Sequence, residues 1–186
     1  VGTPAQNAVA ARAARDSITL LRNTGDVLPL ASGTGAHVLV TGWGAGTTQT
    51  LAASIATHGV TTQRVYTGSS PGSGAIATAV AAANASDDVV ICTDNAWADS
   101  GQQALVQALT ATGRPVVVVA LGGPYDLAYA ADAPAFIAAY GYQPATLDAL
   151  VADLFGAQPR GHLPVTVHSP GTPPTVIASY GSGLRY

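Results

Sequence analysis

Glutamate, lysine and methionine are absent from this chain of 186 residues, and charged side chains make up only 9% of it. Its seven basic residues are all Arg, its ten acidic residues are all Asp, and the formal net charge is −3. So few and scattered cations exclude the recognition of nucleic acid by a basic face. Intrinsic disorder is excluded as well, because 48% of the residues are hydrophobic and the net charge is low.

The chain also has little cysteine and no long apolar run. Cys92 is the single cysteine, so an internal disulfide cannot form. An apolar run such as residues 116–121 is far shorter than the roughly 20 residues that cross a bilayer, and we predict no membrane span. No charged and then apolar leader is recognisable after Val1, and we interpret the chain as a processed or excised part of a longer protein.

Short runs rich in Val and Ile alternate with alanine-rich stretches of helical spacing. The runs that predict strands are residues 37–43, 61–66, 88–93, 115–121, 135–140 and 162–167. Their lack of polar alternation is typical of strands covered on both faces of a parallel sheet. Capping boxes, Pro starts and Gly stops predict helices near residues 4–16, 51–59, 71–83, 100–113 and 144–156. The sequence therefore predicts an α/β fold, a three-layer α/β/α sandwich with a mostly parallel six-stranded sheet.

One domain over residues 1–186 is the economical interpretation of this pattern. Within it, residues 1–30 are interpreted as a linker helix and connection from a preceding domain. The tail, residues 169–186, is rich in Pro, Gly and Ser, and we expect it to wrap the surface without regular structure.

A glycine-rich turn follows the first predicted strand, at residues 42–46 (GWGAG). It invites a dinucleotide-binding interpretation, but Thr47 follows it and no acidic residue lies about 20 positions further on to hold a ribose. A tight strand-to-helix turn that needs positive φ angles is the favoured interpretation. No cofactor is predicted.

Other chemistry-bearing residues give no catalytic or metal site. Cys92 lies in the middle of a predicted strand, where a small buried hydrophobe is a better interpretation than an activated thiolate. The histidines have no metal-ligand spacing, so no metal is predicted. These histidines are His37, His58, His162 and His168.

A polar loop at the end of the strand 88–93 is the strongest candidate for a ligand-facing segment. Asp94 and Asp99 flank it, and it contains Asn95 and Trp97. Ligands of open α/β sheets bind at this edge, where an aromatic ring and an amide could hold a sugar. Paired carboxylates are also the usual machinery of glycoside hydrolysis. The same residues could equally cap the helix that begins near Gly101.

Several segments, in order along nearly the whole chain, resemble the carboxyl-terminal domain of glycoside hydrolase family 3. They are residues 14–23 (ARDSITLLRN), 28–30 (LPL), 114–119 (RPVVVV), 154–156 (LFG), 159–166 (PRGHLPVT) and 180–186 (YGSGLRY). Three further segments look most like the two-domain bacterial β-N-acetylglucosaminidases: residues 95–96 (NA), 124–127 (PYDL) and 138–142 (AAYGY). The resemblance implies an α/β sandwich packed against an amino-terminal TIM-type barrel that carries the family's Asp nucleophile.

The general acid divides that family. In its β-glucosidase branch a glutamate from the carboxyl-terminal domain usually supplies the proton, and this chain has no glutamate to match it. In the N-acetylglucosaminidase branch the acid is a His–Asp pair on a barrel loop. The resemblance therefore favours the second branch, although Asp94 or Asp99 could stand in for the glutamate.

The sequence thus predicts the non-catalytic carboxyl-terminal domain of a family 3 β-N-acetylhexosaminidase, which acts on cell-wall-derived amino sugars and walls the site of a barrel partner. No catalytic residue is predicted here. Trp43, Asn95 and Tyr125 are predicted to contact the carbohydrate substrate, from their placement at strand ends. The alternatives are a β-glucosidase domain, a free-standing carbohydrate- or protein-binding module, and a nucleotide-binding domain. Many such glycosidases are secreted, so an extracellular or cell-envelope location is expected.

Overall fold

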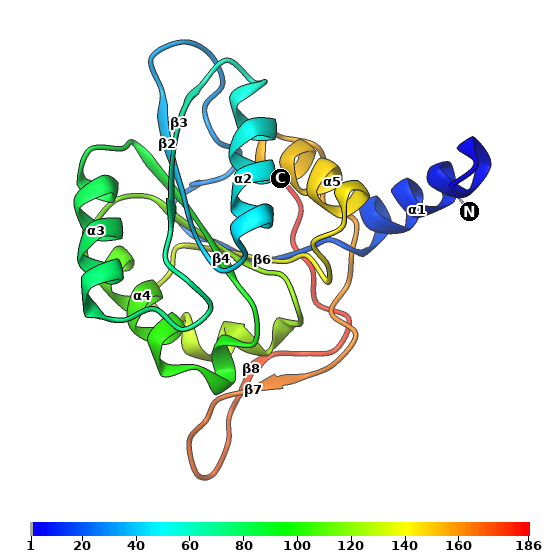
Figure 1. Cartoon of the computed structure of the whole chain (residues 1–186). Coiled ribbons are helices and arrows are strands. Elements are labelled where there is room, and N and C mark those ends of the chain that lie inside the picture. Colours follow the sequence, from blue (N-terminus) through cyan, green and yellow to red (C-terminus); the bar gives the residue numbers. More distant parts are fainter. Residues whose placement is uncertain (1) are drawn as a thin grey trace.

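The computed structural model describes residues 2–186 and arranges strands and helices alternately along the chain (Figure 1). The helices are α1 (Pro4–Ser17), α2 (Ala45–Ala56), α3 (Ser73–Asn84), α4 (Ser100–Thr110) and α5 (Pro144–Leu154), with the 3-10 turns η1 (Ala96–Ala98) and η2 (Pro124–Tyr129). The strands are β1 (Thr19–Asn23), β2 (His37–Gly42), β3 (Thr61–Tyr66), β4 (Asp88–Thr93), β5 (Val116–Ala120), β6 (Ala135–Ala138), β7 (Val167–His168) and β8 (Val176–Ala178).

Six of these strands form one sheet in the order β1-β6-β5-β4-β2-β3. Every neighbouring pair is parallel except β1 and β6, which are antiparallel. In the centre, Val90 of β4 lies opposite Val40 of β2 and Val117 of β5. Every residue of β5 is buried, which explains the unbroken run of Val in the sequence.

Helices cover both faces of the sheet. On one face, α2, α5 and the end of α1 pack on side chains that include Val40, Val90 and Val117. On the other face, α3 and α4 pack on side chains that include Ile91 and Val118. The predicted three-layer α/β/α sandwich is therefore confirmed, with a separate apolar cluster on each side of the sheet.

The identity of the sixth strand differs from the prediction. Residues 162–167 were expected to supply it, but the sheet takes β1, a segment assigned above to the connection over residues 1–30. Leu20 packs into one apolar cluster and Leu21 against the other, as a strand covered on both faces requires. Pro164 has no N–H to donate to a neighbouring strand. Of the predicted strand only Val167 pairs, and together with His168 it forms β7 of a small hairpin with β8.

The chain end covers the edge of β1 that β6 leaves free. The Gly161 N–H donates to the Ile18 carbonyl (2.8 Å) and the Leu184 N–H donates to the Leu20 carbonyl (2.8 Å). A Cβ at Gly161 would overlap the Ser17 carbonyl oxygen, so the close approach needs glycine. The expected lack of regular structure in the tail is wrong at Val176–Ala178, which form β8. Elsewhere the tail wraps the surface and protects an edge strand.

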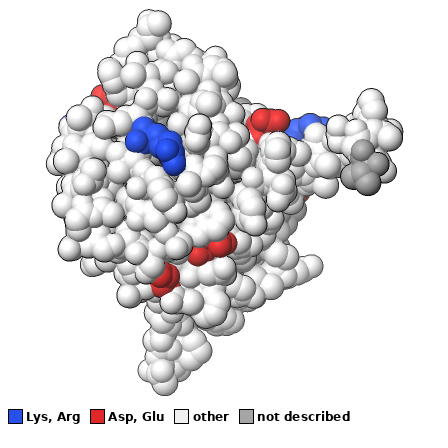
Figure 2. Space-filling model, viewed as in Figure 1, with Lys and Arg blue, Asp and Glu red and all other residues white. Residues whose placement is uncertain are grey.

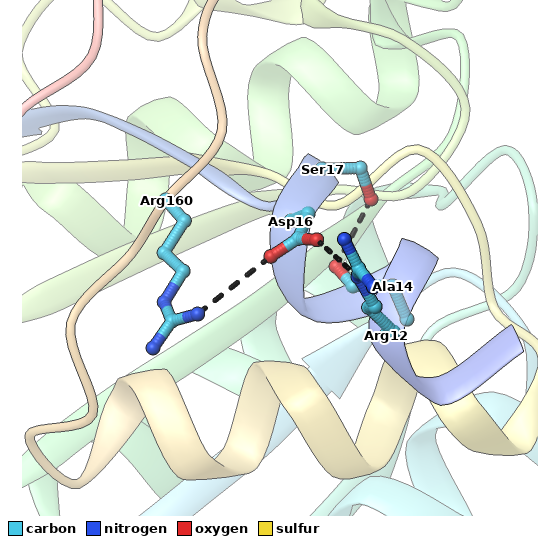
Figure 3. A network of polar contacts seen from close by, with 5 residues as sticks. All are labelled: Arg12, Ala14, Asp16, Ser17 and Arg160. Atoms are coloured by element: carbon cyan, nitrogen blue, oxygen red, sulfur yellow. Dashed lines mark hydrogen bonds and ion pairs between the residues drawn. The ribbon is translucent and has the colours of Figure 1, made fainter. Parts of the chain in front are cut away.

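Helix α1 projects from the body of the molecule (Figure 1), and its buried residue, Ala14, lies near its carboxyl end. Asp16 lies between Arg12 of the same helix (3.5 Å) and Arg160 of the segment after α5 (3.8 Å), as Figure 3 shows. All three side chains are largely exposed, so each ion pair contributes at most about 1 kcal/mol. A capping box of Thr3 and Gln6 begins the helix.

The surface carries few charges. Figure 2 shows isolated blue and red side chains on a face that is otherwise uncharged. Among the helices of residues 2–186, none has both the length and the apolar character to cross a membrane.

Candidate functional site

The carboxyl ends of the parallel strands meet at one edge of the sheet. The chain leaves β2 into α2 on one face and enters β4 from α3 on the other, so the strand order reverses between β2 and β4. In open α/β sheets ligands bind in the crevice at such a reversal. The three predicted substrate-contacting residues all follow these strand ends: Trp43 after β2, Asn95 after β4 and Tyr125 after β5.

The glycine-rich turn after β2 is explained by backbone geometry. Gly42 has φ 103°, Gly44 has φ 81°, and a Cβ at Gly42 would overlap the Cys92 carbonyl oxygen. The Trp43 N–H donates to that same oxygen (2.8 Å). These contacts confirm a tight turn that needs positive φ, and they account for the glycines without a nucleotide.

Trp43 lies beside an aromatic ring that follows the last parallel strand. Its ring centroid is 5.4 Å from that of Tyr142, with the planes tilted by 50°. Trp43 is half-buried, whereas Tyr142 is exposed. The predicted residue therefore forms part of an aromatic pair, and the pair joins the loops that follow β2 and β6.

The loop after β4 turns sharply and presents an indole. Asn95 adopts a left-handed conformation with φ 55°, which Asn tolerates better than most residues. Its side-chain oxygen accepts a hydrogen bond from Trp97 Nε1 (3.2 Å), and Trp97 stays 49% exposed. Asn95 thus orients the ring of Trp97.

A buried carboxylate joins this loop to η2. Asp126 accepts hydrogen bonds from the Thr93 hydroxyl (2.7 Å) and from the backbone N–H of Trp97 (3.2 Å). Burial raises the pKa of Asp126, and the nearby Asp94 adds to the rise. Because Tyr125 precedes Asp126 directly, this one side chain fixes two aromatic residues relative to each other.

The two aspartates that flank the loop are placed differently. Asp99 is the N-cap of α4, and its carboxylate accepts from the Gln102 N–H (2.7 Å). Asp99 therefore caps α4, which is the capping role that the sequence left open for this loop. The carboxylate of Asp94 lies against Gly122, and burial raises its pKa.

Gln102 holds the backbone around Asp94 rather than a ligand. Its amide accepts from the Asp94 N–H (2.9 Å) and donates to the Asp94 carbonyl (3.0 Å) and the Ser69 carbonyl (2.9 Å). The loop is thus fixed from the α4 side as well as from η2.

A pocket of about 380 Å³ opens beside the loop, between η1, η2 and the β7–β8 hairpin. Its lining residues are Trp97, Tyr125, Ala128, Tyr129, Val167, His168, Ser169 and Pro170. Figure 1 shows the hairpin projecting from the sandwich at this edge. A larger hollow of about 690 Å³ lies between α1 and α5, in the helical layer and away from the strand-end loops.

The other chemistry-bearing residues are structural. Cys92 is fully buried, and burial raises the pKa of its thiol to about 12. His58 stacks on Phe155 with ring centroids 3.9 Å apart. Residues 68–72 (GSSPG) fit a G-x-S-x-G spacing after β3, but Ser70 is exposed and has no hydrogen bond to a histidine in the described chain. No three His, Cys or Asp side chains of residues 2–186 gather where they could hold a metal ion.

Sequence reasoning missed three residues of this edge. Tyr142 follows a strand end as Trp43 does, so the same placement rule could have found it. Asp126 lies in the segment 124–127 that resembles the family, but its contact with Thr93 of another strand could not be read from that segment. His168 lines the pocket because it lies in the β7–β8 hairpin. That hairpin was not predicted, because residues 162–167 were assigned to the main sheet.

Taken together, these features define an open-sheet α/β domain whose strand-end loops present aromatic rings and amides. Residues 18–180 match the Glycosyl hydrolase family 3 C-terminal domain, and the chain belongs to this family. The resemblance to that domain in the sequence motifs is thereby confirmed. No curated protein sequence matches the chain.

Solved structures of two kinds of enzyme share the fold. A family 3 β-N-acetylglucosaminidase from Paenibacillus sp. str. FPU-7 is 24% identical, with a TM-score of 0.72 over 83% of this chain and 31% of its own. A β-glucosidase from Erythrobacter marinus is 25% identical, with a TM-score of 0.76 over 99% of this chain and 35% of its own. A β-glucosidase from Listeria innocua is 18% identical, with a TM-score of 0.77 over 100% of this chain and 34% of its own.

This chain therefore spans about a third of the length of each of these enzymes. Their substrates differ, so similarity to them shows the fold but not the sugar.

Proposed function

We propose that this chain is the non-catalytic C-terminal domain of a family 3 β-N-acetylhexosaminidase that removes terminal N-acetylglucosamine. In this proposal a TIM-type barrel of the same enzyme carries the nucleophile and the acid. The domain packs on that barrel and walls its active site with the loops that follow β2, β4 and β5. Cell-wall-derived amino sugars outside the cytoplasm are the substrates we propose.

The observation that carries the proposal is the lack of a catalytic carboxylate pair at the strand-end edge. The chain has no glutamate. Of the three aspartates there, Asp99 caps α4 and Asp126 is buried between the Thr93 hydroxyl and the Trp97 N–H. A retaining glycosidase needs a nucleophile and an acid about 5 Å apart, and in this proposal both come from the barrel.

One observation favours a second candidate, a β-glucosidase in which Asp94 donates the proton. Asp94 follows β4 at the ligand-facing edge, and its carboxylate has no hydrogen-bond partner within residues 2–186. Burial raises its pKa, as a general acid requires. The two candidates therefore differ in both the sugar and the origin of the acid.

Substrate preference distinguishes the two candidate functions. The complete product of the reading frame that encodes this chain is assayed with 4-nitrophenyl N-acetyl-β-D-glucosaminide and 4-nitrophenyl β-D-glucoside. The proposal predicts a kcat/KM at least about tenfold higher for the glucosaminide. It also predicts no turnover of either by the 186-residue chain alone. Preference for the glucoside supports the second candidate and overturns the first.

A further inference from the structure

The pocket beside η1 has the shape and lining of a small-molecule site. Its volume of about 380 Å³ lies in the range of roughly 300–1,000 Å³ that ligand pockets occupy. Trp97 and Tyr125 are each 49% exposed there, although rings of this size gain free energy from burial. Two large, half-exposed rings in one pocket therefore offer apolar faces that a ligand could cover.

The Trp97 indole is held in place before any ligand arrives, and the Trp97 backbone is anchored next to Tyr125. Asn95 fixes the indole of Trp97 through Nε1 (3.2 Å), and Asp126 fixes the Trp97 backbone (3.2 Å) beside Tyr125. The Gln103 side-chain amide also donates to the Ala96 carbonyl (2.7 Å). A pre-formed platform loses little conformational entropy when it binds.

The polar groups of the pocket fit hydroxyls and not charges. No Asp or Arg lines it. Within residues 2–186, the hydroxyls of Tyr125 and Tyr129 and the imidazole of His168 have no hydrogen-bond partner. The floor is apolar, with Ala128 and Val167. An uncharged ligand with an apolar ring face and a hydroxyl rim matches this lining.

We infer that this pocket binds one uncharged pyranose ring, stacked on Trp97 and Tyr125 with its hydroxyls toward Tyr129 and His168. The axial C–H groups of a pyranose with equatorial substituents form an apolar face, which packs on the electron-rich face of an aromatic ring. The inference rests on the proposed function for the choice of a sugar. It deepens that function by naming a sugar contact built from the loops after β4 and β5 and the β7–β8 hairpin of this chain.

The test is an NMR titration of the ¹⁵N-labelled 186-residue chain, which contains two tryptophans and hence two indole N–H signals. Trp43→Phe assigns them. The probes are methyl N-acetyl-β-D-glucosaminide and methyl β-D-glucopyranoside, and sorbitol is the acyclic control that has hydroxyls but no ring face. The inference predicts that at least one glycoside shifts the Trp97 indole signal with a Kd of about millimolar, that the Trp43 signal stays still, and that sorbitol shifts neither.

Two matched variants test the platform. Tyr125→Ala weakens binding about tenfold, the loss expected for one stacked ring. Tyr66→Ala removes a tyrosine of similar exposure, 46%, on β3 and leaves the Kd unchanged. Equal shifts with sorbitol, no Trp97 shift with either glycoside, or equal effects of the two variants would overturn the inference. Because binding is measured without hydrolysis, its failure is distinguishable from failure of the glucosaminide assay.

Discussion

At the scale of single residues, one buried carboxyl group that lacks a hydrogen-bond partner has the clearest consequence for stability. Asp153 of α5 is buried, and its Oδ2 atom has no hydrogen-bond partner within residues 2–186. Burial raises its pKa to about 7, and the opposing effect of Arg160 is smaller. The folded chain therefore holds a proton on Asp153 that the unfolded chain has lost above pH 4.

This predicts a stability that falls as pH rises from about 4 to about 7, because the folded state binds more protons over that range. Asp153→Asn keeps the shape and removes the charge. At pH 7.5 we expect the variant to be more stable than the wild type, by up to about 4 kcal/mol, with the advantage vanishing at pH 4. Urea unfolding at the two pH values measures it. Asp148→Asn, exposed on the same helix, is the control, and a similar gain there would refute the assignment.

Which residues lie at the strand ends could be predicted from the sequence, but which of them contact one another could not. Trp43, Asn95 and Tyr125 do lie at the carboxyl ends of the strands, because parallel strands end together. Which of them share a pocket depends on Asp126 and on the β7–β8 hairpin, and both act through contacts between distant segments. Whether the three residues contact substrate stays a prediction.

At the scale of elements, the central strands were predictable because both of their faces are buried. Runs such as Val116–Ala120 need no polar alternation, and α4 next to them begins at the capping residue Asp99. Strand β1 was not predictable in this way. It is short, lies directly after α1, and becomes a strand only through pairing with β6, more than 100 residues away.

The motif at residues 159–166 now has a structural explanation, because Gly161 presses against the start of β1. We predict that Gly161→Ala destabilises the chain by about 1–3 kcal/mol, since the new Cβ would overlap the Ser17 carbonyl and the Thr19 hydroxyl. The Leu184 amide, which bonds to Leu20, should exchange faster with solvent. Gly171→Ala is the control, because its Cβ meets Ser169 Oγ at an ordinary 3.7 Å. Equal loss of stability in the two variants would count against the role given to Gly161.

At the scale of the whole molecule, the sandwich carries one organised edge and a sparsely charged exterior. The family and the three-layer fold follow from the order of motifs and the alternation of elements, and both are confirmed. The sugar does not follow, because the solved relatives include a β-N-acetylglucosaminidase and β-glucosidases at similar identity. The same fold serves both kinds of enzyme.

The central claim is that this chain supplies no catalytic group. Asp94 tests this claim most directly, because it is the proton donor in the second candidate function. The measurement is the kcat/KM of the complete enzyme carrying Asp94→Asn on its preferred aryl glycoside, with Asp132→Asn, an exposed loop variant, as control. The account predicts that both variants stay within about threefold of the wild type, because the acid lies elsewhere. A loss of about a hundredfold or more in Asp94→Asn alone, the usual contribution of a general acid, would contradict it.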